Sequence, residues 1–144
     1  MKLDGVSYVI VQHLSSDFKS QMVELLSRHS KLMVEEVQSG MNVLSNRVYL
    51  IPNDKFMAIH ENCLYLTNKQ SAKEPHHTIN IFFKSLAIDS GKKTIGVVLS
   101  GMGSDSTEGV RAIKMAGGMV IVRNPETTDF ASMPTRQVQG AICI

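Results

Sequence analysis

The chain has 144 residues, a length that suits one domain with a sizeable core. Hydrophobic residues make up 43% and charged residues 19%, and the net charge of +2 comes from scattered Lys and Arg, which gives no basis for binding nucleic acid. No apolar run near the N-terminus is long enough for a membrane span, and Cys63 and Cys143 lack CxxC spacing. We therefore expect a soluble, cytoplasmic domain without membrane insertion.

The first half of the chain predicts strands, a helix and a hairpin. The β-branched run at residues 6–12 predicts a buried strand, and the Ser-Ser-Asp sequence at 15–17 supplies N-cap candidates for a helix. The apolar face of that helix is expected to carry Phe18, Met22, Leu25 and Leu26. Strands are expected at 33–37 and 47–51 with a loop at 38–42 between them, and a β-hairpin is expected over 56–60 and 63–66.

The second half alternates helices and strands after a polar loop at residues 69–77. A helix capped by Thr78 and ended by Gly91 precedes a buried strand at 95–99. The apolar face of this helix comprises Ile79, Phe82, Phe83, Leu86 and Ala87. A second helix presents Val110, Ile113 and Ala116 on one face, a strand follows at 119–122, and a last helix is expected to begin at Pro134.

The order of these elements predicts an α/β fold. We expect a mostly parallel, doubly wound sheet with helices on both faces and one added antiparallel β-hairpin. Residues 1–144 are expected to form a single domain that is truncated at both ends, because the chain enters a strand almost at once and stops on an apolar run. A shortened sheet would expose an edge or an apolar face that favours dimerisation.

Two side chains that suit catalysis follow predicted strands. His13 comes directly after the strand at 6–12, and Asp105 follows the strand at 95–99. The carboxyl ends of parallel strands share one edge of a sheet, where a carboxylate can orient an imidazole that acts as a general base. The backbone N–H groups of residues 101–103 are candidates for an oxyanion hole.

Simpler interpretations of these residues stay open. Asp105 and Glu108 fit a helix-capping pattern, and a histidine at the end of a strand is more often structural than catalytic. The glycines at 101 and 103 do not match a dinucleotide-binding pattern, because the third glycine arrives at 109. The remaining histidines, His29, His60, His76 and His77, show no spacing that indicates a metal site.

Several motifs in order nevertheless resemble one family. They lie at residues 9–14, 48–52, 79–83, 97–105, 112–118 and 132–134. Together they are similar to the catalytic domain of the CheB-type protein-glutamate methylesterases of bacterial chemotaxis. The resemblance covers nearly the whole chain, and its most distinctive part is the sequence Val-Val-Leu-Ser-Gly-Met-Gly-Ser-Asp at 97–105.

The resemblance implies a serine hydrolase, a carboxylic ester hydrolase that removes methyl groups from glutamates of chemoreceptors and releases methanol. It implies His13 as general base, Asp105 as its orienting acid and the backbone N–H of Met102 as part of the oxyanion hole. It implies no metal and no organic cofactor. The implied partners are the cytoplasmic domains of methylated chemoreceptors, with a receiver or methyltransferase domain as a possible neighbour in the parent protein.

Two departures qualify the resemblance. The family's nucleophilic serine lies in a glycine-rich turn upstream of the histidine, and Ser15, Ser16, Ser100 and Ser104 each suit a cap or turn instead. We therefore expect little or no esterase activity from these 144 residues alone. Ser106 stands where the family usually has glycine. The alternatives are a non-catalytic module that binds a receptor or another partner and, more weakly, a flavodoxin-like ligand-binding protein.

Overall fold

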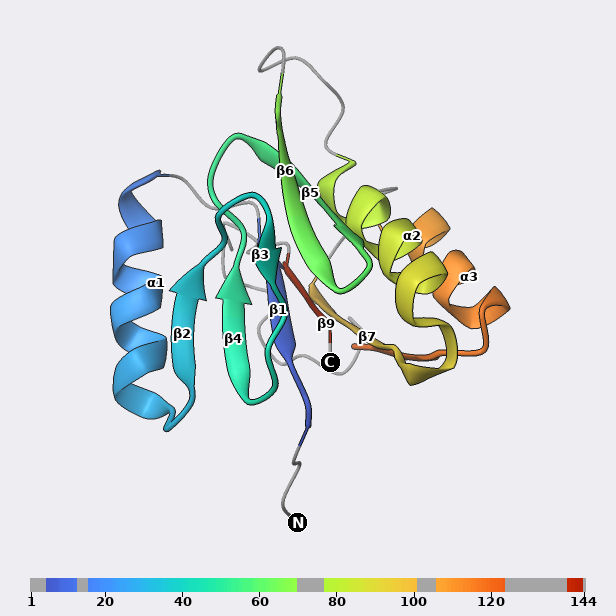
Figure 1. Cartoon of the computed structure of the whole chain (residues 1–144), viewed down its shortest axis with the longest axis horizontal. Helices are drawn as coiled ribbons and strands as arrows, with labels where there is room; N and C mark the ends of the chain where they lie inside the picture. The colour runs from blue at the N-terminus through green and yellow to red at the C-terminus, as the bar shows by residue number, and fades with distance from the viewer. Residues whose placement is uncertain (1–4, 13–15, 70–76, 101–105, 124–139, 144) are drawn as a thin grey trace, which may run out of the picture.

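The computed structural model describes residues 5–12, 16–69, 77–100, 106–123 and 140–143 (Figure 1). The helices are α1 (Ser16–His29), α2 (Thr78–Ser90) and α3 (Thr107–Met115), and a short 3-10 turn, η1, covers Gly91–Lys93. The strands are β1 (Tyr8–Gln12), β2 (Met33–Glu36), β3 (Met41–Asn42), β4 (Arg47–Leu50), β5 (Lys55–His60), β6 (Cys63–Asn68), β7 (Ile95–Ser100), β8 (Met119–Val122) and β9 (Gly140–Cys143).

The main sheet has six strands in the order β2-β4-β1-β9-β7-β8. β4 pairs parallel with both β1 and β2, and β7 pairs parallel with β8, whereas β9 pairs antiparallel with both β1 and β7. The prediction of an α/β fold with a largely parallel sheet is confirmed. The antiparallel strand in its middle was not predicted, and β9 is what joins the two parallel parts in the described structure.

Alternation along the strands divides the core between the two faces of the sheet. Ile10, Val48 and Leu50 pack with Met22, Val23 and Leu26 of α1 on one face. Val9, Val11 and Tyr49 belong to the larger cluster on the other face, which also contains Phe82 and Phe83 of α2 and Ile113 of α3. Figure 1 shows α1 on one side of the sheet and α2 with α3 on the other.

The hairpin lies in a second, three-stranded sheet of order β3-β6-β5. β5 and β6 pair antiparallel, and Glu61 and Asn62 turn between them with φ of 48° and 61°. The loop predicted at 38–42 is partly wrong, because Met41 and Asn42 form β3 by pairing with Leu64 and Cys63. Two paired residues leave no alternating pattern, so the sequence alone does not reveal such a strand.

Two side-chain predictions are also wrong. Leu25 was expected on the apolar face of α1 but is 52% exposed, because Met22, Val23 and Leu26 take the sheet-facing positions instead. Thr78 was expected to cap α2, but His77 is the N-cap residue and makes no side-chain capping bond. Thr78 begins the helix with its hydroxyl buried. Gly91 ends α2 as predicted, with φ of 48°.

α2 and α3 lie side by side and run in the same direction. Asn80, near the start of α2, contacts Gly109 near the start of α3, and Gly91 after α2 lies beside Ala116 after α3. A Cβ atom at Gly109 would lie 2.6 Å from Cβ of Phe83 and 3.3 Å from Cα of Asn80. Only glycine therefore allows α3 to approach α2 this closely.

We expect Gly109→Ala to destabilise the protein by about 1–2 kcal/mol, although alanine is the better helix former. The atoms that the new methyl group meets belong to a Cβ and a backbone, which cannot rotate away. Chemical denaturation measures the free energy of unfolding, with the exposed α3 change Lys114→Ala as control. A variant Gly109→Ala as stable as the control would contradict the close packing.

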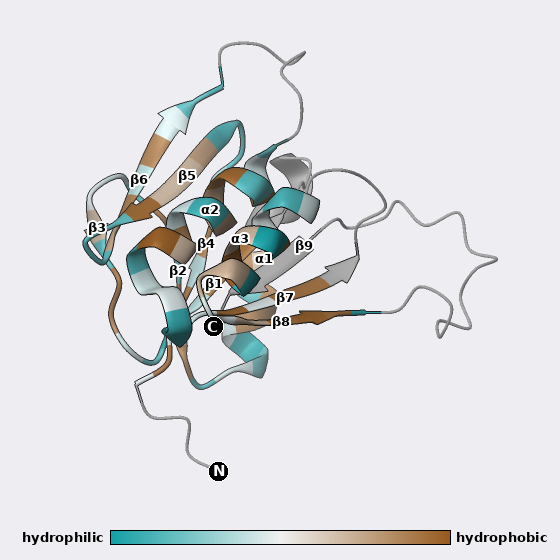
Figure 2. Ribbon diagram, turned by 90° about the vertical axis from the view of Figure 1, so that its right-hand side faces the viewer, coloured by the Kyte–Doolittle hydropathy of each residue, from teal (hydrophilic) through white to brown (hydrophobic). Residues whose placement is uncertain are grey.

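The β8 edge of the main sheet is apolar. Met119, Ile121 and Val122 are each more than half exposed there, and Figure 2 shows hydrophobic colour along β7 and β8. Whether this edge favours dimerisation stays a prediction. In the part of the chain that the structure describes, no helix is long and apolar enough to cross a membrane.

Candidate active site

The predicted catalytic residues themselves lie outside the described residues. His13 follows β1, and Met102 and Asp105 fall between the end of β7 and the start of α3. The structure does not bring these side chains together or separate them, so their roles stay predictions. It does describe the elements that flank them: the end of β1, the end of β7 and the first turn of α3.

The register of the sheet places the ends of β1 and β7 at the same level. Gln12, the last residue of β1, pairs with Gly140, and Ser100, the last residue of β7, pairs with the same glycine from the other side. Because neighbouring strands lie about 4.8 Å apart, the two strand ends are separated by roughly 10 Å. β1 and β7 therefore end at one edge of the sheet, as the sequence predicts for the strands that precede His13 and residues 101–105.

A side chain of α2 forms a hydrogen bond with the first turn of α3. The side-chain Oδ1 of Asn80, which is buried, accepts a hydrogen bond of 2.8 Å from the backbone N–H of Gly109. Ser106 is the N-cap residue of α3 with φ of −155°, outside the region that requires glycine. The serine at 106 is therefore compatible with the backbone there, although the family usually has glycine.

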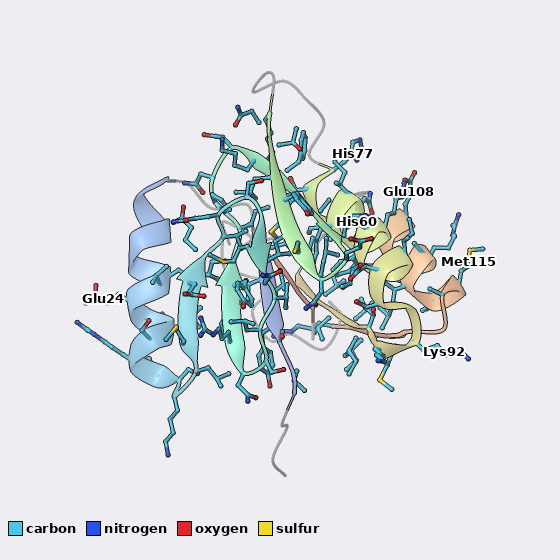
Figure 3. All side chains as sticks on the ribbon, viewed as in Figure 1. Glu24, His60, His77, Lys92, Glu108 and Met115 are labelled. Atoms are coloured by element: carbon cyan, nitrogen blue, oxygen red, sulfur yellow. The ribbon has the colours of Figure 1, made fainter. Side chains whose placement is uncertain are left out.

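An ion pair between the same two helices lies beside this contact. Lys84 Nζ of α2 donates to Glu108 Oε2 of α3 at 2.6 Å. This hydrogen bond and the charge of Lys84 lower the pKa of Glu108 below its ordinary value of 4.5, with smaller contributions from His77 and Arg111. Figure 3 shows Glu108 and His77 near the same ends of the two helices.

Replacing Lys84 by Met should raise the pKa of Glu108 toward 4.5, because the cause of the lowering is removed. The pair stabilises the fold above the pKa of Glu108 in the unfolded chain, and this contribution is lost as pH falls through the lower folded value. Both side chains are more than half exposed, so the effect on stability is small. Carboxyl-carbon NMR titration measures the pKa, with Lys114→Met as control. An unchanged pKa of Glu108 in Lys84→Met would contradict the ion pair between these two residues.

The other described histidines and Cys63, which are candidate metal ligands, lie on different elements. His29 ends α1, as predicted, and His60 lies at the end of β5 with 75% of its side chain exposed. Cys63 is a free cysteine whose Sγ lies 2.8 Å from Asn42 Oδ1. Within the described ranges, no three His, Cys, Asp or Glu side chains are grouped so that they could hold a metal ion.

Sequence analysis missed the contact between Asn80 and Gly109. Two features of the sequence pointed to it. Asn80 is a polar residue among the apolar residues at 79–83, and Gly109 lies within a helical segment, where glycine lowers helix stability by about 1 kcal/mol relative to alanine. An unexplained glycine and an unexplained amide in two adjacent helices favour a close helix–helix contact. The pattern does not show which partner each one has.

The arrangement defines a class of protein: an α/β domain whose candidate catalytic residues follow parallel strands that end at one edge of the sheet. Comparison with known proteins identifies the family within this class. The model of the family described as CheB methylesterase matches residues 2–143. The chain belongs to the CheB methylesterase family, whose curated members are hydrolases named as protein-glutamate methylesterases.

Individual relatives agree with this assignment. The chain is 28% identical over 139 residues to the protein-glutamate methylesterase/protein-glutamine glutaminase of Photorhabdus laumondii subsp. laumondii, covering 93% of this chain and 40% of that protein. It is 24% identical over 148 residues to the protein of the same name from Escherichia coli K12, covering 99% and 42%. The chain thus spans well under half the length of these relatives.

Two further matches extend the comparison. The crystal structure of the Thermotoga maritima CheB methylesterase catalytic domain superposes with a TM-score of 0.70 at 30% identity, covering 84% of this chain and 66% of that one. An uncharacterized 104.1 kDa protein of Rhodobacter capsulatus is 38% identical over 113 residues, which are 78% of this chain and 12% of that protein. Segments similar to this chain therefore also occur within much longer proteins.

Proposed function

We propose that this chain forms part of one doubly wound CheB-type catalytic domain, which hydrolyses glutamate methyl esters on the cytoplasmic domains of chemoreceptors. The proposal places the domain in the cytoplasm with its substrate. Beyond family membership, one observation carries it: Gln12 and Ser100 pair with the same residue, Gly140, so the strands that precede His13 and residues 101–105 end level with each other. That spacing suits a histidine and a carboxylate that reach toward one another.

The proposed mechanism uses a serine, His13 and Asp105. Asp105 accepts a hydrogen bond from one ring nitrogen of His13, which leaves the other nitrogen to take the proton of the serine hydroxyl. The serine oxygen attacks the ester carbonyl, and the oxygen that becomes negative accepts a hydrogen bond from the backbone N–H of Met102. His13 then gives its proton to the leaving methoxide, methanol departs, and water hydrolyses the acyl-enzyme.

The helix arrangement supports charge stabilisation at this edge. α3 follows β7 in the chain, and α2 runs parallel to α3, so the N-termini of both helices lie toward the same edge of the sheet. Helix N-termini carry positive partial charge, which stabilises an oxyanion nearby. This field acts together with the backbone N–H groups rather than replacing them.

The nucleophile is the part of the proposed triad that we do not assign to a residue of this sequence. Ser16 begins α1 and Ser100 ends β7, while Ser15 and Ser104 lie outside the described residues. The family resemblance implies a serine in a glycine-rich turn N-terminal to the histidine. We accordingly predict that the 144 residues by themselves release methanol from methylated receptor no faster than buffer does.

The test of the proposed function is a methanol-release assay with the full product of the gene that encodes these residues. Radiolabelled methyl groups on the receptor cytoplasmic domain report hydrolysis, and a receptor with its methylated glutamates replaced by alanine is the control. We expect hydrolysis with the first substrate only. A full-length product without hydrolysis would refute the enzymatic function.

The alternative is a non-catalytic module that retains the fold and binds a chemoreceptor or another signalling protein. This alternative requires the fold but none of the proposed catalytic groups. Binding of the receptor cytoplasmic domain without hydrolysis by the full-length product would select this alternative. Hydrolysis that depends on His13 would reject it.

A further inference from the structure

Asn80 supplies the first turn of α3 with an acceptor that its N-cap residue, Ser106, does not supply. The first backbone N–H groups of a helix have no acceptor within the helix, and a side chain at the N-cap usually supplies one. Ser106 occupies the N-cap of α3 but makes no such side-chain bond, and the first intrahelical bond runs from Val110 N to Ser106 O. The N–H of Gly109, one residue earlier, donates instead to Asn80 Oδ1 at 2.8 Å.

The surroundings of this bond prevent the first turn of α3 from sliding or rotating. Asn80 is 3% exposed, so water does not compete for its amide oxygen. Gly109 lies directly on Phe83, where there is no room for a Cβ atom, and the ion pair between Lys84 and Glu108 lies beside it. Three contacts from α2 thus fix both the distance and the rotation of the α3 N-terminus.

We infer that Asn80 is a positioning residue of the active site: through the backbone of Gly109 it fixes the first turn of α3 and, with it, the segment that carries Asp105. Asp105 lies four positions before Gly109 in the sequence and is separated from Thr107, the first residue of α3, by Ser106 alone. We expect a shift of that turn to weaken the proposed interaction between Asp105 and His13. This inference rests on the proposed function, because it assumes that Asp105 and His13 act together.

The structure offers a matched control on the same helix. Ser85 of α2 accepts a hydrogen bond of 3.0 Å from the backbone N–H of Ile59 in β5. Ser85 and Asn80 each hold a neighbouring element by one side-chain oxygen, but Ser85 holds the hairpin and not α3. A general loss of stability affects both variants, whereas a positional effect at Asp105 is expected for Asn80 alone.

The experiment is an NMR titration of the histidine ring protons in the 144-residue chain, with His13 assigned through His13→Gln. A nearby carboxylate favours the protonated imidazole, so Asp105→Asn should lower the pKa of His13. We expect Asn80→Leu to produce at least half of the decrease that Asp105→Asn produces. Ser85→Ala should leave His13 unchanged, and Asn80→Asp, which keeps the acceptor oxygen, should not lower the pKa.

The outcomes separate the inference from the function on which it rests. If Asp105→Asn lowers the pKa of His13 but Asn80→Leu does not, the inference is refuted and the proposed pair stands. If Asp105→Asn has no effect, the pair itself is absent and both fail. If Asn80→Leu does not fold, the Asn80→Asp variant is used instead, because it keeps the acceptor oxygen. The positioning role is refuted if this variant folds but the pKa of His13 is as low as in Asp105→Asn.

Discussion

Replacing His13 by Gln in the full-length gene product should lower kcat/KM for methyl-ester hydrolysis by about 10³-fold or more, which corresponds to ~4 kcal/mol of transition-state stabilisation. Glutamine approximates the size of the imidazole but cannot take a proton from a serine hydroxyl. The loss should fall on kcat rather than KM, because the proposed role is proton transfer and not receptor binding. Methanol release at several receptor concentrations separates the two constants.

The control for this variant is His60→Gln. His60 lies at the end of β5, is largely exposed and has its ring Nε2 3.9 Å from Glu61 Oε1. We expect wild-type rates from it. Equal activity of the two variants would remove His13 from the mechanism, and loss of receptor binding by His13→Gln would indicate a contact surface rather than a base.

Phe83→Ala should be the most destabilising single change among the described core residues that we consider, at about 3–5 kcal/mol. The ring is fully buried between α2, α3 and the sheet. Gly96 of β7 and Gly109 of α3 both face it so closely that a Cβ at either position would lie within 3.4 Å of Phe83. Removal of the ring therefore leaves a cavity that is partly lined by the backbone of Gly96 and Gly109, which is expected to collapse poorly.

Denaturant and thermal unfolding measure this loss, and we expect Tm to fall by roughly 10 °C. The control is Ile88→Ala on the same helix, where the side chain is 87% exposed and the expected change is within about 0.5 kcal/mol. A Phe83→Ala variant that loses less than 1 kcal/mol would show that α2 and α3 do not pack on β7 as described. The same variant should also weaken the contact between Asn80 and Gly109.

The elements that depend on local pattern were predictable from the sequence. Residues 78–90 carry apolar side chains at helical spacing and end in Gly91, and the structure has α2 there. The strand at 95–99 is a short apolar run between a helix and glycines, and β7 occupies it. In both cases the signal and the structure lie within about a dozen neighbouring residues.

Features that depend on partners far along the chain were not predictable. Residues 140–143 contain nothing that selects a place between β1 and β7, because that position results from pairing with strands distant in sequence. The exposure of Leu25 depends on which side of α1 meets the sheet. At the site, the shared edge of β1 and β7 followed from the expected parallel direction of these strands, whereas the role of Asn80 required knowledge of which helix lies beside α2.

The central position of β9 has a consequence for the order of folding. β1 pairs with β4, and β7 with β8, each within a short stretch of chain, whereas β9 joins Val9 to Cys143 across almost the full sequence. Closing so long a loop costs more conformational entropy than forming either local pair. The pairing of β1 with β9 should therefore acquire protection from hydrogen exchange after the pairings of β1 with β4 and of β7 with β8 and β9, and the edge that aligns the ends of β1 and β7 should be complete only in that last step.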